Sequence, residues 1–325
     1  MNGNPRPRFL MCRPTHFGVV YAINPWMKPQ DWQPHETMLA AQAQRQWAGL
    51  YRALLNREAG IDLVPEVERL PDLVFTANAA VLLDGKALLA RFRHPERRAE
   101  EPHFRAMFQA LKARGVIEKV CELPGGIVLE GAGDCVFDRS RNLFWMGFGP
   151  RSDASARSVV EDTFGIDTVG LELCDPRFYH MDTALCPLPG GEVLYVPGAF
   201  TAAGQAAIAE RVPAGRRIEV GEGDASQLAA NAVCLGDTLL MSACSARLRA
   251  ELSERGYEVA VVPLGAFLRS GGSAFCLTLR LDRRSAAAGE AAMQRRPVES
   301  GRLSPHGHSG APRSGEPGIQ IGRKS

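Results

Sequence analysis

Five stretches of the chain share one order of polar and apolar positions. Each begins with a short cluster of small or polar residues and passes into an apolar run. In the first four, a turn at DG, DRSRN, PGGE or GD leads into a second apolar run, which is the pattern of a β-hairpin. The fifth has only its first strand, as expected where a chain closes a repeated architecture. The stretches are DLVFTANAAVLLDGKALLARF, IVLEGAGDCVFDRSRNLFWMGFG, FYHMDTALCPLPGGEVLYVPGAF, LAANAVCLGDTLLMSAC and GGSAFCLTLRL.

Segments with the apolar spacing of an amphipathic helix lie between the hairpins. Two of them, AAIAERV and ARLRAELSERG, are followed by the short apolar runs RRIEV and YEVAVVPL. The repeated unit is therefore predicted to be strand–strand–helix–strand. In two of these patterns, residues 36–58 and 104–111, apolar side chains recur at helical spacing. They are Leu39, Ala43, Trp47, Leu50, Leu54 and Leu55 in the first, and Phe104, Met107, Phe108 and Leu111 in the second.

One polar or reactive residue marks the start of each hairpin, and successive markers are about 45–56 residues apart. Such spacing is typical of propellers and repeat arrays. Five units closed head to tail bring all five hairpin starts to one axis, so we predict an α/β fold, a five-bladed α/β-propeller, with its site at the axis. The alternative is an ordinary mixed α/β domain in which the alignment is coincidental. The markers are Asn78, Asp134, Asp182, Asn231 and Cys276.

Composition limits the class of protein. The 325 residues carry a formal charge of +2, which gives no global field toward nucleic acid or an anionic membrane. The chain has no apolar run long enough for a membrane span and no secretory signal at its start, so we expect a cytoplasmic protein. Residues 1–284 are predicted to form a single catalytic domain. Residues 285–325, poor in large apolar groups, are predicted to be a disordered tail.

Eight cysteines occur without a CxxC pair, which favours reduced thiols over a disulfide framework or a zinc knuckle. The residues expected at the axis include one cysteine, one histidine and several carboxylates. Carboxylates suit a planar cation with several N–H donors, and the guanidinium group is the biological example. A thiol adds a nucleophile able to attack the guanidinium carbon. The set is Asn78, Glu130, Asp134, His180, Asp182, Asn231 and Cys276.

Each of these residues also has a structural interpretation. Cys276 is either the nucleophile or a reduced core thiol, and Gly271 and Gly272 before it favour a close approach of substrate. His180 is either a catalytic group or a hydrogen-bonded core histidine. We expect it on a strand with Asp182, where residues two apart share a face.

Two further motifs have alternative interpretations. The segment EGAGD lacks the third glycine of a dinucleotide-binding loop and enters a hairpin, so a nucleotide-binding α/β protein is disfavoured. Its glycines fit a tight turn that places two carboxylates. The run RFRHPERR is either a solvated loop or, through Arg97, a clamp for a substrate carboxylate. Arg151 in GPRSD offers the same two interpretations.

EGAGD, FYHMDT and GGSAFCLTLR resemble, in this order, the motifs of the guanidino-group-modifying enzymes, whose fold is the five-bladed pentein propeller. The family includes arginine deiminases, dimethylarginine dimethylaminohydrolases and amidinotransferases. The resemblance, from about Phe9 to Arg283, implies a hydrolase of linear amidines with three catalytic residues, Cys276 as nucleophile, His180 and Glu130. It also implies that Glu130 and Asp182 bind the guanidinium group. Asp134 and Asn231, at hairpin starts, are expected to bind substrate as well, and the expected chemistry needs neither a metal nor an organic cofactor.

INPWM, FTAN, RFxHxER and GFGxRS are most similar to one branch, the arginine dihydrolases, which convert arginine to ornithine, ammonia and carbon dioxide. The resemblance implies that Asn24 and Asn78 line the guanidine pocket, and that Arg97 and Arg151 hold the amino-acid end of the substrate. Phe275 stands where the branch has lysine beside the nucleophile.

Several readings stay open. Dimethylargininase or arginine deiminase activity that gives citrulline, an amidinotransferase and a non-enzymatic ribosome-binding pentein are the alternatives. The expected partner is a small guanidino molecule such as arginine or a derivative, and no nucleic acid or membrane. A homo-oligomer is compatible with the sequence.

Overall fold

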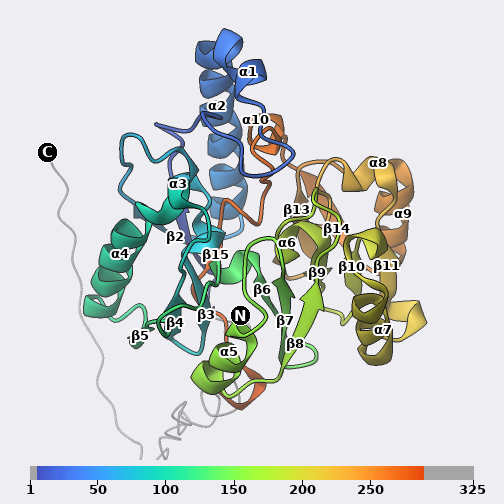
Figure 1. The fold of residues 1–325 in the computed structure, drawn as a ribbon. Coiled ribbons are helices and arrows are strands. Elements are labelled where there is room, and N and C mark those ends of the chain that lie inside the picture. Colours follow the sequence, from blue (N-terminus) through green and yellow to red (C-terminus); the bar gives the residue numbers. More distant parts are fainter. Residues whose placement is uncertain (1–5, 289–325) are drawn as a thin grey trace, which may run out of the picture.

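A computed structural model describes residues 6–288 and arranges them as five three-stranded sheets around a common centre (Figure 1). In each sheet the middle strand is antiparallel to one neighbour and parallel to the other. The antiparallel pair is a hairpin in four of the five sheets, and a helix joins it to the parallel strand. The predicted strand–strand–helix–strand unit is therefore confirmed.

The strands are short, as expected for units that pack around a centre. In chain order they are β1 (Arg8–Cys12), β2 (Gly60–Val64), β3 (Ala80–Leu83), β4 (Lys86–Leu89), β5 (Lys119–Cys121), β6 (Cys135–Asp138), β7 (Leu143–Phe148), β8 (Thr168–Glu172), β9 (Leu185–Pro187), β10 (Val193–Tyr195), β11 (Arg217–Glu219), β12 (Val233–Leu235), β13 (Thr238–Met241), β14 (Glu258–Val261) and β15 (Leu279–Arg280).

One long helix belongs to each unit and lies on the outside of the ring of sheets (Figure 1). These helices are α2 (Glu36–Leu55), α4 (Glu101–Ala113), α5 (Ala156–Phe164), α7 (Ala202–Arg211) and α9 (Ala246–Glu254). Single turns of helix lie between them, namely α1 (Pro29–Trp32), α3 (Pro95–Arg98), α6 (Met181–Ala184), α8 (Glu222–Ala225) and α10 (Gly265–Leu268), with 3₁₀ turns η1 (Gln33–His35), η2 (Pro71–Val74), η3 (Thr76–Ala79), η4 (Gly131–Gly133), η5 (Pro197–Ala199) and η6 (Ala214–Arg216).

The first predicted helix is correct in position but ends at Leu55 rather than Glu58. Its apolar stripe faces the core except at its end, where Leu55 is 43% exposed. Leu55 therefore does not belong to the buried face that the sequence pattern assigned to it. Three side chains of the α4 pattern, Phe104, Phe108 and Leu111, are buried as expected.

The two ends of the domain close the ring. Strand β15 pairs antiparallel with β1, with Leu279 opposite Leu10, and β1 pairs in parallel with β2. The last hairpin strand therefore completes the sheet that the chain began, which confirms the expectation drawn from the unpaired fifth stretch. Ser285, where we predicted the tail to begin, is buried and its N–H donates to Asp84. Most of that predicted tail, residues 289–325, lies outside the described residues.

The five marker residues meet at the centre, where hydrogen bonds join the hairpin starts into a ring. The amide of Asn78 donates to the Glu130 carbonyl, and the Met181 N–H donates to the Asp134 carboxylate. Asn231 donates to the carbonyl of Asp182 and accepts from the N–H of Cys276.

The ring closes where the last hairpin start meets the first. The Ala77 N–H donates to the carbonyl of Cys276 at 3.1 Å. Every unit is thus bonded to the next through a marker residue or its neighbour. The positions of these side chains depend on closure of the whole propeller.

Closure makes Leu10 a sensitive position. We expect Leu10→Ala to lower the free energy of unfolding by about 2–5 kcal/mol, because a cavity opens where the first and last units pack. Leu55→Ala, at a half-exposed position of α2, is the control and should change it by less than about 1 kcal/mol. Urea unfolding measures both variants. Equal effects would show that ring closure does not depend on packing at Leu10.

Candidate active site

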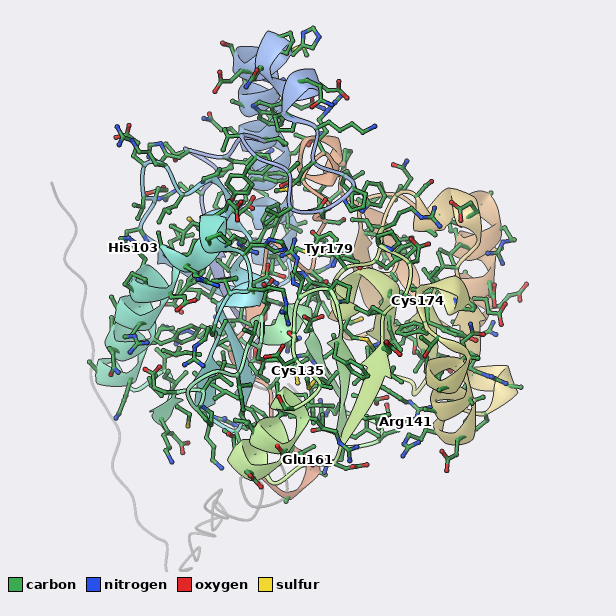
Figure 2. All side chains as sticks on the ribbon, in the orientation of Figure 1. His103, Cys135, Arg141, Glu161, Cys174 and Tyr179 are labelled. Carbon is green, nitrogen blue, oxygen red and sulfur yellow. The ribbon has the colours of Figure 1, made fainter. Side chains whose placement is uncertain are left out.

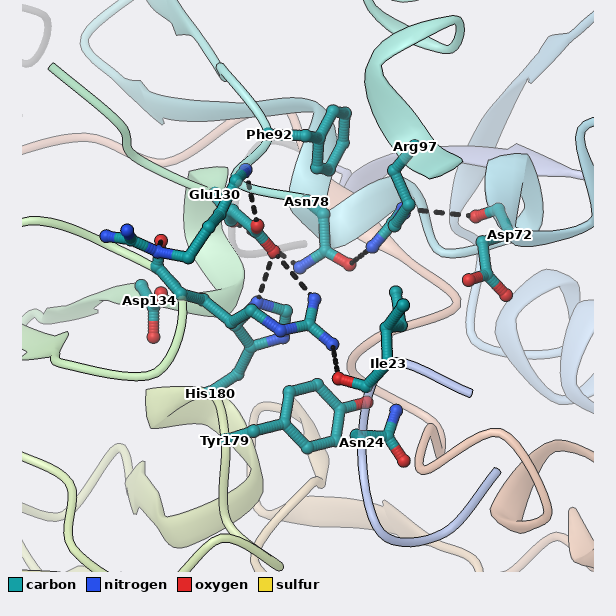
Figure 3. Close-up of polar contacts among 12 residues, drawn as sticks. Ile23, Asn24, Asp72, Asn78, Phe92, Arg97, Glu130, Asp134, Tyr179 and His180 are labelled. Carbon is teal, nitrogen blue, oxygen red and sulfur yellow. Dashed lines mark hydrogen bonds and ion pairs between the residues drawn. The ribbon is translucent and has the colours of Figure 1, made fainter. Parts of the chain in front are cut away.

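Glu130 is the hub of the central network (Figure 3). Its side chain is fully buried, and one carboxylate oxygen accepts from Arg151 at 3.0 Å and lies 2.8 Å from Nε2 of His180. The other oxygen accepts the backbone N–H of Arg93 at 3.0 Å. Although burial alone raises it, Arg151 and His180 hold the pKa of Glu130 far below its usual range. Glu130 is therefore an anion whose position is fixed from three sides.

The second buried arginine, Arg97, is held by a bidentate pair with Glu100, at 2.9 and 2.8 Å. It donates to the side-chain oxygen of Asn78 at 2.8 Å, and its guanidinium lies over the ring of Phe92. Helix α3 carries Arg97 to the centre. The sequence reading of RFRHPERR as a solvated loop is wrong for this residue, which is 3% exposed.

Cys276 lies in a second cluster next to the first. Its sulfur is 3.2 Å from Oδ2 of Asp182 and 3.1 Å from the amide nitrogen of Asn231. The other carboxylate oxygen of Asp182, Oδ1, is buried and has no hydrogen-bond partner. Buried acceptors are normally paired, so an unpaired carboxylate oxygen beside a thiol marks a place for a donor. The structure brings together the three residues that the sequence placed at successive hairpin starts.

Burial shifts the pKa values of Cys276 and Asp182 in this second cluster. It raises the pKa of Cys276 well above its usual range, and the nearby Asp182 raises it further. Burial also raises the pKa of Asp182 to about 7, against hydrogen bonds from Cys276 and Asn231. Burial therefore favours the neutral thiol of Cys276 and holds Asp182 near half protonation at neutral pH. A cation bound beside them reverses that preference, because it stabilises carboxylate and thiolate together.

His180 occupies a different local structure from the one predicted. It is the N-cap residue of α6, and Asp182 lies within that short helix, so the two do not share the face of a strand. The strand expectation is wrong because the chain makes one helical turn before β9 begins. The turn still serves one centre, since His180 contacts Glu130 and Asp182 contacts Cys276.

Asp134 and Asn24 have structural contacts of their own. Asp134 accepts from the hydroxyl of Ser152 at 2.5 Å and from the N–H of Met181 at 3.1 Å, so both of its oxygens are used within the protein. The oxygen of Asn24 caps a turn by accepting from Trp26 N–H, and its amide donates to the Ser270 carbonyl. Asn24 and Asp134 are the two predicted site residues whose side chains hydrogen-bond to no other predicted site residue.

Glycine at two motifs permits close packing at the axis. A Cβ on Gly133 would lie 2.1 Å from the side-chain amide of Asn78, so EGAGD lets two hairpin starts touch. A Cβ on Gly272 would lie 2.3 Å from the ring of Phe75, and Gly271, with φ of +80°, faces Trp26 and Tyr179. The glycines before Cys276 therefore make room for aromatic side chains of the protein, whereas their position in the sequence favoured a close approach of substrate.

Several buried polar residues of the site were not found from sequence. Asp72 accepts from the hydroxyl of Tyr21 at 2.9 Å, and Glu100 holds Arg97. Tyr179 lies under the guanidinium of Arg151 and near the middle of the molecule, whereas His103 and Glu161 lie at its edge (Figure 2). Tyr179 adjoins His180 in FYHMDT, which was a usable signal. Asp72 and Glu100 stand in ordinary polar contexts without one.

The centre is closed in this structure. Cys276 is 2% exposed and His180 is 1% exposed. A cavity of about 430 Å³ is lined by Trp26, Lys28 and Arg269 among others, and by none of Cys276, His180 and Glu130. Trp26 donates its indole N–H to the Arg177 carbonyl, and the carbonyl of Ile23 accepts from Arg151. A ligand reaching Cys276 must therefore displace covering groups.

Residues 6–288 contain no group of three His, Cys, Asp or Glu side chains placed to hold a metal ion. None of the helices in this range is both long and apolar enough to cross a membrane.

Comparison with known proteins places this arrangement in a family. Residues 13–283 match the family described as N,N dimethylarginine dimethylhydrolase, eukaryotic. A dimethylarginine dimethylaminohydrolase of Mycobacterium tuberculosis is 35% identical over 84% of this chain and 85% of its own length. The chain belongs to this family of guanidino-group-modifying proteins, as the motifs predicted.

A second group of relatives carries the dihydrolase name. The bifunctional arginine dihydrolase/ornithine cyclodeaminase ArgZ of Synechocystis is 42% identical over 84% of this chain. This chain spans only 37% of that relative's length. The crystal structure of the N-terminal domain of ArgZ bound to substrate superposes with a TM-score of 0.78 at 39% identity, over 86% of this chain and 99% of that domain. The predicted pentein propeller is confirmed.

The buried histidine gives a pH dependence to stability. Burial lowers the pKa of His180 to about 4, against its contact with Glu130. Because the unfolded chain takes up this proton below about pH 6.5 and the folded protein does not, the contribution of His180 to stability is lost as the pH falls through this window. We expect the unfolding free energy to fall by roughly 2 kcal/mol more in the wild type than in His180→Gln between about pH 7 and pH 4.5.

Glutamine retains an N–H donor for Glu130 but does not titrate, which makes it the matched variant. Urea unfolding at several pH values measures the difference. Identical pH profiles would mean that His180 keeps its ordinary proton affinity in the folded protein.

Proposed function

We propose that this protein is an arginine dihydrolase, which hydrolyses arginine to ornithine, carbon dioxide and two molecules of ammonia. The observation that carries the proposal is the unpaired oxygen of Asp182 beside the sulfur of Cys276. A guanidinium N–H donated to that oxygen brings the electron-poor guanidinium carbon next to the thiol. A planar cation at this position also balances the charge of the Asp182 carboxylate, which favours its binding.

The first hydrolysis uses Cys276 as nucleophile and His180 as proton carrier. As the guanidinium binds, the proton of the Cys276 thiol passes to His180; the thiolate attacks the guanidinium carbon, His180 donates that proton to the departing nitrogen, and ammonia leaves a covalent thiouronium. His180 then takes a proton from water, which attacks the same carbon and expels the thiolate to give citrulline. Glu130 keeps the imidazole in place through its 2.8 Å contact with Nε2.

Two buried arginines are suited to bind the amino-acid end of the substrate. Arg97 and Arg151 are the only arginines among residues 6–288 that are buried, and both retain N–H groups beyond their bonds to Glu100, Asn78, Asp72, Glu130 and Ile23. We assign them to the substrate carboxylate. Asn24, Asp134 and Asn231 complete the proposed binding set, the last two through the positions they give to Met181 and Cys276.

A second hydrolysis requires the site to accept the neutral ureido group of citrulline. Asn78 has no charge, and its oxygen is already engaged by Arg97 at 2.8 Å. An uncharged amide here adds no negative charge to the pocket, which therefore accepts a neutral ligand more readily than a pocket with one more carboxylate would. Attack by Cys276 on the ureido carbon then releases the second ammonia, and hydrolysis gives a carbamate that loses carbon dioxide. The match to the substrate-bound ArgZ domain supports this branch.

Dimethylargininase activity is the second candidate, favoured by the family match and by the Mycobacterium tuberculosis relative. Phe275, in place of the branch lysine, is compatible with either substrate. Cytoplasmic location and assembly as a homo-oligomer stay predictions, and the eight free cysteines fit a reducing compartment.

The proposal predicts ornithine and two ammonia per arginine consumed. Cys276→Ser should reduce turnover by at least about a thousandfold, because the hydroxyl is a far weaker nucleophile at neutral pH. Cys244→Ser, at a partly buried thiol away from the axis, is the control and should retain activity. Following ammonia, citrulline and ornithine together identifies the reaction. Turnover of dimethylarginine but not arginine would favour the second candidate.

Asn78→Asp tests the second hydrolysis separately. A carboxylate at this position faces Arg97 and adds negative charge where the neutral ureido group must bind. We expect the variant to consume arginine but to accumulate citrulline, with ornithine formation reduced about tenfold or more. Unchanged ornithine production would contradict the role given to the uncharged amide. Direct feeding of citrulline shows whether the second step alone is affected.

A further inference from the structure

Two cysteines outside the active site face each other across neighbouring sheets. Cys186 lies in β9 and Cys234 in β12, and their sulfur atoms are 3.7 Å apart. Each sulfur also lies near the other strand's carbonyls, Cys186 at 3.8 Å from that of Ala232 and Cys234 at 3.9 Å from that of Pro187. No other two cysteine sulfurs in the described part of the chain are in such contact.

We propose that Cys186 and Cys234 are a modification site that forms a reversible disulfide under mild oxidation, and that this disulfide slows turnover at Cys276. The disulfide requires the sulfurs to approach to about 2.0 Å. Rotation of the two side chains, with a small movement of the strands, covers the remaining distance. The geometry differs from that of an isolated buried thiol, which has no resolving partner.

The surroundings divide the roles of the two thiols. Cys234 is partly exposed and Cys186 is buried. The Cys186 contact and the nearby cations Arg283 and Arg280 lower the pKa of Cys234, while the pKa of Cys186 is raised. Arg280 also donates to the carbonyl of Cys234 at 3.3 Å. Cys234 is therefore the thiol that meets an oxidant first, and Cys186 is the resolving thiol.

The chemistry balances with a peroxide as the oxidant. The Cys234 thiolate attacks one oxygen of hydrogen peroxide, the O–O bond breaks, and sulfenic acid and water form once a proton is taken up. The Cys186 thiol then attacks the sulfenic sulfur and releases a second water. Two thiols and one peroxide thus give one disulfide and two waters. A dithiol reductant reverses the change by thiol–disulfide exchange.

The link to the active site runs along the two strands. β9 directly follows α6, which carries Asp182, and β12 begins two residues after Asn231. These two residues are the side chains in contact with the sulfur of Cys276, at 3.2 and 3.1 Å. Drawing the strands together displaces one or both contacts. A misplacement of about 1 Å at reacting groups lowers rates by up to about a hundredfold.

The effect on turnover rests on the proposed function, whereas formation of the disulfide does not. Full-length protein is treated with dilute hydrogen peroxide, the peroxide is removed with catalase, and free thiols are alkylated before peptide mapping by mass spectrometry. We expect a cross-linked pair of peptides containing Cys186 and Cys234, with Cys276 recovered as the free, alkylated thiol. Absence of that cross-linked pair would overturn the proposal.

Activity on arginine is measured on the same samples. We expect kcat/KM to fall at least about tenfold on oxidation and to recover with dithiothreitol. Cys186→Ser and Cys234→Ser should each keep their activity under the same treatment, and the exposed Cys174 (Figure 2), as Cys174→Ser, should respond like the wild type. Equal inactivation of all variants would show direct oxidation of Cys276 and contradict the proposal.

A readout without substrate separates the two proposals. The rate at which iodoacetamide alkylates Cys276 is compared between reduced and oxidised protein. A change in that rate of about threefold or more, present in the wild type and absent in Cys234→Ser, supports the coupling even if arginine is not turned over. An unchanged rate with the disulfide formed would overturn the coupling.

Discussion

The hydrogen-bond ring at the axis is the constraint on which the rest of the structure depends. Each hairpin begins with a tight turn whose polar groups have no strand partner, and burial makes an unpaired backbone group costly. The five turns satisfy one another, as in the bond from Ala77 to the carbonyl of Cys276. The ring is complete only when β15 pairs with β1. Closure of the fold and assembly of the site are consequently one event.

The centre holds an unusual density of buried charge for a small volume. Arg97, Arg151, Glu100 and Glu130 are all at most 3% exposed. Buried ions are tolerated when they are paired and hydrogen-bonded, and each arginine here has a carboxylate at 3.0 Å or less. Such pairing holds the groups rigidly before any ligand arrives. One carboxylate oxygen of Asp182 has no hydrogen-bond partner. A ligand that donates a hydrogen bond to this oxygen gains binding free energy there.

The position of strands β9 and β12 next to the active site links a movement of these strands to the environment of Cys276. Strands β9 and β12 are only three residues long and follow directly on the turns that hold Asp182 and Asn231. A displacement of one of these strands moves the adjoining turn as well, because a well-packed interior has few voids in which the shift could be absorbed. A thiol pair between these strands therefore acts on the nucleophile without contacting it. The propeller makes every hairpin start a neighbour of the active site.

The sequence by itself determined the repeat, the hairpins and the marker residues, because turn residues and apolar alternation are local properties. It also placed Cys276, His180 and Glu130, since each stands at a hairpin start and the starts must converge. Local patterns could not show that Arg97 is buried, that His180 caps a helical turn, or that Asp72 and Glu100 belong to the site. Those features rest on contacts between distant segments, such as Glu130 with His180, fifty residues apart. Only the closed ring brings them within reach of one another, and desolvation there sets their charges.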